Sequence, residues 1–208
     1  MARAKTTERV DRRDELLRVG MEMFDTIAYD EIAVADIAAK AGVAHGLLFH
    51  YFGSKRKFFV EVMRQEVTEI SAIFAANPYG PQDPVRWLRW DLGMFVRLSR
   101  DRPESVNRVG RGATAIDPEL DELFRTVRQT TIQRHLEVMG ATEPAPLLEG
   151  ALYGWIGFAF EAMPRWLGAN VSDRRIQRLL TDQLVATLHN VARIDKRATF
   201  DPKVFDGA

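Results

Sequence analysis

The side chains of this 208-residue chain that could do chemistry gather between positions 44 and 55. The set is Ala44, His45, Gly46, Leu47, His50, Tyr51 and Lys55. An imidazole N–H can donate to a guanine edge, and an apolar side chain such as Leu47 can pack on a thymine methyl group. Gly46 allows a close approach of the backbone. The other side chains, His50, Tyr51 and Lys55, suit phosphate contacts. The pattern therefore indicates binding to nucleic acid.

Two short helices within residues 34–53 must position these side chains. Ile37 and Ala41 face inward from the first helix, and Leu48 does so from the second. Gly42 lies between them, where the turn needs a positive φ. Helices of about two turns bury little surface alone, so they must pack on each other and on a third helix. This predicts a helix-turn-helix, whose second helix enters the major groove. A helical hairpin with no DNA role is the alternative.

The segment from Arg13 to Phe59 resembles the N-terminal domain of the tetracycline-repressor-like (TetR) family. The matching words are LLRVGMEMF, VADIAAKAGVA, GLLFHYF and GSK. The resemblance implies a DNA-binding domain of three helices and a bridging fourth helix. It also implies a ligand domain, and a dimer built from the last two long helices.

The chain departs from this family at several positions that would touch DNA. Ala33 stands where a threonine usually starts the first short helix, which loses a cap and a phosphate contact. Ala44, Leu47 and Phe49 stand where hydroxyl-bearing residues are common. His45 stands where lysine is frequent. We therefore expect DNA contact to depend more on the N-terminal arm, His50, Tyr51 and Lys55.

Helical spacing recurs along the whole chain without a strand pattern, which predicts an all-α fold of about nine helices. Leu16, Gly20, Met23, Phe24 and Ile27 form one face of the first helix. Ser54 is a candidate N-cap, and Asp83 followed by Pro84 predicts a later helix start. We expect a helix-turn-helix domain over 1–53 and a ligand-binding and dimerisation domain over 54–208. The residues after Ile194 are expected to form a loosely held tail.

Aromatic residues, including all four tryptophans, concentrate in the second of these domains. The candidate effector-binding residues are Trp87, Trp90, Met94, Trp155 and Phe158. Aromatic stripes at helical spacing also pack in ordinary cores, so both interpretations stay open. Because the ligand of the resembled family lies among the middle helices, the resemblance implies a mainly apolar effector here.

The last two helices carry the candidate dimer contacts. Gly150, Gly154 and Gly157 allow a close backbone approach, either within the chain or at a seam between two copies. A stripe on the final helix is expected to join that interface. It consists of Ile176, Leu180, Leu184, Leu188 and Val191.

Composition excludes several classes of function. The chain has no cysteine, so disulfides and thiol chemistry are absent, and a cytoplasmic location is expected. No secretory signal is visible, and the uncharged run at 150–160 is far shorter than the roughly 20 residues of a spanning helix. No phosphate-binding loop, G-x-S-x-G or H-E-x-x-H motif occurs, so we expect no enzyme, catalytic residue, metal or cofactor. His135 and His189 are isolated and are expected to be surface or hydrogen-bonded histidines.

We therefore expect a ligand-responsive transcriptional repressor. It would bind a pseudo-palindromic operator in double-stranded DNA as a homodimer and be released by a small, mainly apolar effector. The alternative is a helical DNA-binding protein without a small-molecule effector. Release from DNA by a ligand would separate the two.

Overall fold

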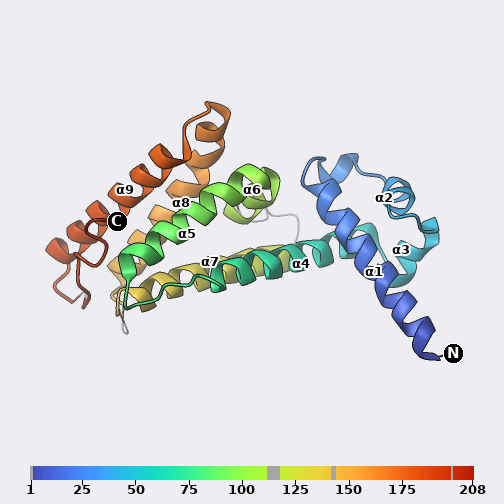
Figure 1. The fold of residues 1–208 in the computed structure, drawn as a ribbon, viewed down its shortest axis with the longest axis horizontal. Helices are drawn as coiled ribbons and strands as arrows, with labels where there is room; N and C mark the ends of the chain where they lie inside the picture. The colour runs from blue at the N-terminus through green and yellow to red at the C-terminus, as the bar shows by residue number, and fades with distance from the viewer. Residues whose placement is uncertain (1, 112–117, 142–143, 198) are drawn as a thin grey trace. The chain divides into compact units, whose positions relative to one another are not determined.

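The computed structural model describes residues 2–111, 118–141, 144–197 and 199–208, which form α-helices joined by turns and loops (Figure 1). The helices are α1 (Ala2–Phe24), α2 (Val34–Lys40), α3 (His45–Phe52), α4 (Lys55–Ala75), α5 (Pro84–Asp101), α6 (Pro103–Arg111), α7 (Pro118–Val138), α8 (Pro146–Gly168) and α9 (Asp173–Ile194). A 3-10 turn, Tyr29–Glu31, precedes α2. Across the described ranges there is no strand, and the prediction of an all-α fold is confirmed.

The chain forms two compact units, Met1–Ile70 and Ser71–Ala208, called here the N-terminal and C-terminal units. Their boundary falls inside α4, whose last turn belongs to the C-terminal unit. The sequence instead predicts the domain boundary between residues 53 and 54, just before the first residue of α4. The division of functions between those domains stays a prediction.

The N-terminal unit packs α1, α2, α3 and the start of α4 around one apolar core. Leu16, Ile37, Leu48 and Phe58 are fully buried in it. Gly42 has a φ of 65°, which confirms the predicted turn between α2 and α3. Ile27 departs from the predicted face, because α1 ends at Phe24 and leaves Ile27 exposed.

The local signals for helix starts are confirmed. Ser54 Oγ accepts a hydrogen bond from the backbone N–H of Lys57 at 3.1 Å, so it caps α4. Asp83 accepts from the backbone N–H of Arg86 at 3.2 Å, and Pro84 follows it at the first helical position. These caps satisfy amides that have no partner inside the helix.

The C-terminal unit is built around one core from α5, α7, α8 and α9. The leucine stripe of α9 lies inside that core, with Leu180, Leu184 and Leu188 fully buried. The expectation that this stripe joins a dimer interface is therefore wrong. The same apolar face packs on α8 and α5 of its own chain, as Figure 1 shows for these helices.

The segment after α9 is not a loosely held tail. Phe205 is fully buried in the core of the C-terminal unit. Arg89 on α5 donates to the carbonyl oxygen of Gly207, and His189 Nε2 lies 3.1 Å from Asp206 Oδ1. The expectation failed because one apolar side chain and two polar contacts hold the segment against the helices.

A search of the described helices finds none that is long and apolar enough to cross a bilayer. Helix α8 contains the uncharged run at 150–160 and instead buries Leu152, Trp155 and Ile156 in the core.

Candidate nucleic-acid interface

The outward face of α3 carries His45, Gly46, Phe49 and His50, all exposed. At about 100° per residue these four positions span roughly 140° of the helix surface. Leu48 and Phe52 are buried and anchor the helix in the core. A short helix held by one apolar face and bare on the other has the geometry that enters a major groove.

Phe49 is a member of this face that the sequence analysis did not select. Its side chain is 43% exposed, and its ring meets the ring of His45 edge-on, with centroids 5.6 Å apart. The spacing of four residues from His45 was the signal that could have found it. Leu47 and Tyr51 are half-buried at the flank of the face, and Ala44 is exposed just before it.

Lys55 is held inside the N-terminal unit. Its Nζ donates to the backbone carbonyl oxygen of Tyr29 at 2.6 Å and lies 4.4 Å from the centre of the Tyr29 ring. The ammonium group thus fixes the 3-10 turn to the start of α4. Lys57, two positions later, is exposed to solvent on the same first turn. Lys57 is therefore more accessible to solvent than Lys55.

The predicted loss of a cap at Ala33 is confirmed. Neither Ala33 before α2 nor Ala44 before α3 makes a side-chain capping bond to any described residue. The alanine side chain has no oxygen that could accept a hydrogen bond from the first amides of a helix.

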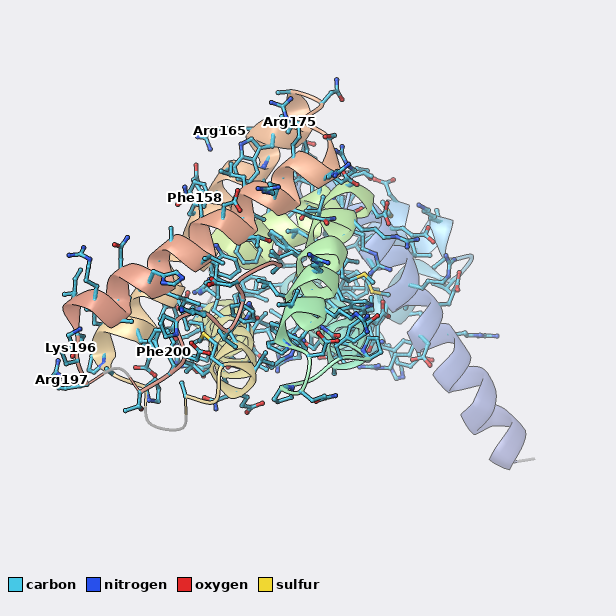
Figure 2. All side chains as sticks on the ribbon, turned by 60° about the vertical axis from the view of Figure 1, so that its left-hand side comes forward. Phe158, Arg165, Arg175, Lys196, Arg197 and Phe200 are labelled. Carbon is cyan, nitrogen blue, oxygen red and sulfur yellow. The ribbon has the colours of Figure 1, made fainter. Side chains whose placement is uncertain are left out.

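The candidate effector residues of the C-terminal unit do not form one group. Trp87 on α5 and Trp155 on α8 are buried, while Trp90 and Met94 are half-buried. Phe158 is 40% exposed on the outer side of α8 (Figure 2). The role of these residues in ligand binding stays a prediction.

His135 on α7 joins Trp87 and Trp155. The ring centroids are 4.9 Å apart for Trp87 and His135 and 5.4 Å apart for His135 and Trp155. His135 is not a surface residue, because it is only 2% exposed. It is hydrogen-bonded, as the other expectation had it, but only through Nδ1, which lies 2.9 Å from the carbonyl oxygen of Thr131. Its Nε2 has no hydrogen-bond partner among the described residues. Ile132 and Leu136, three residues before His135 and one after it, are apolar. This helical pattern could have predicted from the sequence that His135 is buried.

A buried ion pair lies beside this aromatic cluster. Arg134 Nη2 donates to Asp91 Oδ1 at 3.1 Å and to the carbonyl oxygen of Phe74 at 2.8 Å. Burial raises the pKa of Asp91, although the charges of His135 and Arg134 oppose that rise. Burial also lowers the pKa of His135, against the opposing charge of Asp91. Both shifts follow from the cost of burying charge.

A surface groove of about 610 Å³ lies elsewhere in the C-terminal unit. It runs along α5 and α9 and is lined mainly by polar side chains, among them Arg89, Arg174, Arg175 and Arg178. None of the five candidate effector residues lines it.

The outer side of α8 is open. A Cβ atom added at Gly150, Gly154 or Gly157 would meet no other described part of the chain within 4 Å. An intrachain close contact at these glycines is therefore wrong, and a seam between copies is the alternative that remains. Leu147 and Phe158 are exposed large apolar side chains on the same helix.

Comparison with known proteins agrees with this geometry. Residues 16–62 match the family described as "Bacterial regulatory proteins, tetR family". The chain is 36% identical over 93 residues to the HTH-type transcriptional regulator BetI 2 of Chromohalobacter salexigens, covering 45% of this chain and 44% of that protein. It is 28% identical over 75 residues to the HTH-type transcriptional repressor AcnR of Corynebacterium jeikeium, covering 36% and 40%. These matches span less than half the length of the curated relatives.

The fold is similar to that of solved regulators over nearly the whole chain. A tetR-family transcriptional regulator from Streptomyces coelicolor matches with a TM-score of 0.77 at 24% identity. The match covers 90% of this chain and 84% of that one. The resemblance expected from the sequence is thus confirmed.

Proposed function

We propose a function for this chain from the premise that it belongs to the tetR family of bacterial regulatory proteins. It is a transcriptional repressor that binds a pseudo-palindromic DNA operator as a homodimer. A small, mainly apolar effector releases it. Its relatives are regulators, and no catalytic role is proposed.

The observation that carries DNA binding is the exposed face of α3. His45 would donate to a base edge, and Phe49 beside it would pack on a thymine methyl group. Gly46 lets the helix backbone approach the groove floor. Lys57 and His50 at the margins would contact phosphates and set the docking of the helix.

The open side of α8 supports the homodimer. Glycines that meet nothing in their own chain leave room for a second copy of the helix. Two recognition helices related by a two-fold axis would then read half-sites about one turn of DNA, or a multiple of it, apart.

The test is DNA binding by variants on an operator selected from random sequence. His45→Ala should change which base is preferred at one position of each half-site. Lys57→Ala should weaken binding to all sequences and lower the salt slope by about two, roughly one for each protomer of the dimer. Lys203→Ala, an exposed cation of the C-terminal unit, is the matched control and should change neither quantity. Unaltered preference and slope in the first two variants would refute this docking.

A DNA-binding protein without an effector remains the second candidate. It is kept as a candidate because the groove along α5 and α9 is lined by none of the five candidate effector residues. Screening small apolar molecules by thermal shift, then repeating the operator titration with each hit, separates the two. Hits that stabilise the protein without changing operator affinity would favour this candidate.

A further inference from the structure

The position of His135 is unusual for a polar side chain. It lies between two indole rings, those of Trp87 and Trp155, in the core of the C-terminal unit. Trp155 Nε1 already donates to the carbonyl oxygen of Leu180 at 3.0 Å, so that indole has no N–H to offer the imidazole. Trp155 therefore gives His135 a ring contact but no hydrogen bond.

The tautomer of His135 follows from its one hydrogen bond. Nδ1 lies 2.9 Å from the carbonyl oxygen of Thr131, and a carbonyl oxygen can only accept. Nδ1 therefore carries the proton, and Nε2 is a bare acceptor. No described residue donates to Nε2, which is buried. Burial lowers the pKa of His135, which keeps the ring neutral.

The charged groups nearby are balanced. The Asp91 carboxylate is paired with the Arg134 guanidinium at 3.1 Å, and Arg134 also donates to the Phe74 carbonyl oxygen. A charged molecule would therefore lose its hydration without gaining an unpaired counter-charge. An uncharged molecule with one donor group would satisfy Nε2 at no such cost.

We propose that the effector of this protein makes its polar contact with His135 Nε2, between Trp87 and Trp155. The proposal rests on the proposed function and names the ligand class for it. The ligand is an uncharged, mainly aromatic molecule that carries a hydroxyl or N–H donor. Because the closed cluster leaves Nε2 unpaired, a donor ligand favours an opened arrangement of these rings over the closed one.

Arg134 connects this site to the end of α4. It stacks over Trp87, 5.5 Å from the ring centre, and bonds the carbonyl oxygen of Phe74 in the last turn of α4. A ligand that moves Trp87 away from His135 also moves the ring on which Arg134 stacks. Helix α4 directly follows α3 in the sequence. Through the contact between Arg134 and α4, ligand binding at His135 would affect the DNA-binding unit.

The test compares two isomeric probes, p-cresol, which has a hydroxyl donor, and anisole, which has none. Calorimetry near neutral pH should show wild-type protein binding p-cresol at least about fivefold more tightly than anisole. His135→Phe keeps the ring contacts and removes the acceptor, so the preference should vanish. His189→Phe, at an exposed histidine of the same unit, is the matched control and should keep it.

A second measurement does not depend on a variant that folds. Nitrogen NMR of wild-type protein should show His135 with Nδ1 protonated and Nε2 bare, and p-cresol should shift the Nε2 signal while anisole should not. Equal affinities for the probes, binding of neither, or a preference that survives in His135→Phe would overturn the proposal.

The operator titration separates this proposal from the function it rests on. If p-cresol binds through His135 and lowers operator affinity, both are supported. If it binds through His135 and leaves operator affinity unchanged, the site stands and the effector mechanism fails. If operator binding is normal and the probe preference is missing, the His135 site alone fails.

Discussion

Gly20 on α1 and Gly154 on α8 are both helical glycines, but the first lies against other side chains and the second is exposed. A Cβ at Gly20 would lie 2.6 Å from Phe58 Cζ and 2.7 Å from Val62 Cγ2. A Cβ at Gly154 would meet no described atom outside its helix within 4 Å. The first glycine therefore completes packing inside the N-terminal unit. The second lies on a face of α8 that no other described part of the chain covers. Packing within the chain therefore does not require a glycine at this position.

The largest effect should come from filling the occupied site. Gly20→Leu must displace the Phe58 ring and Val62, both buried in the core. We expect a loss of at least about 3 kcal/mol in the free energy of unfolding, at the upper end of overpacking costs. Urea denaturation followed by circular dichroism measures it. A stability equal to wild type would mean that α1 and α4 are not packed this closely.

The same substitution at the open site should act on assembly instead. Gly154→Leu should preserve the fold of the single chain, because leucine favours helix over glycine by roughly 1 kcal/mol. It should weaken a dimer whose seam crosses α8 by about 1–3 kcal/mol, roughly 5- to 150-fold in dissociation constant.

Sedimentation equilibrium measures that constant, with Thr126→Leu on the exposed side of α7 as the control. The dimer hypothesis fails if wild-type protein is a monomer at micromolar concentration. The seam at α8 fails if Gly154→Leu dimerises as tightly as the control.

Two histidines extend the comparison to pH. His45 is exposed on α3, whereas His135 is buried and its pKa is lowered from the ordinary 6.5 by burial. At a pH below that value the unfolded chain takes up a proton that the folded protein resists, so His135 makes stability rise with pH. Asp91, whose pKa is raised by burial, acts in the opposite direction.

We therefore expect wild-type protein to lose more stability than His135→Phe between about pH 7 and about pH 5, the range in which a histidine titrates. His45→Phe, the control, should follow wild type. Chemical denaturation at each pH gives the free energies. Parallel curves for wild type and His135→Phe would mean that the buried ring does not stay neutral.

These pairs also show which features the sequence could predict. The starts of helices were predictable, because they depend on residues close in sequence. Ser54 caps the start of α4, and Pro84 is the first residue of α5. The exposed face of α3 was predictable in outline from helical periodicity, but the residues selected from the sequence did not include Phe49. The cluster at His135 was not predictable, because it needs the crossing of α5, α7 and α8, which depends on contacts distant in sequence.

The smallest expected effects are those of alanine substitutions at Lys55 and Lys57, two lysines on the first turn of α4. Lys55 Nζ is bonded to the Tyr29 carbonyl oxygen, a contact across 26 positions of sequence, whereas Lys57 is exposed. Lys55→Ala should lower the free energy of unfolding by about 1 kcal/mol, since the bond is charged but only half-buried. Its salt slope for operator binding should match wild type, because its ammonium group is engaged by the carbonyl oxygen of Tyr29. Lys57→Ala should leave the free energy of unfolding unchanged and lower the salt slope by about two, roughly one for each protomer of the dimer. Denaturation and salt titration of both variants decide the matter. A lowered slope in Lys55→Ala would mean that DNA draws the ammonium group away from Tyr29.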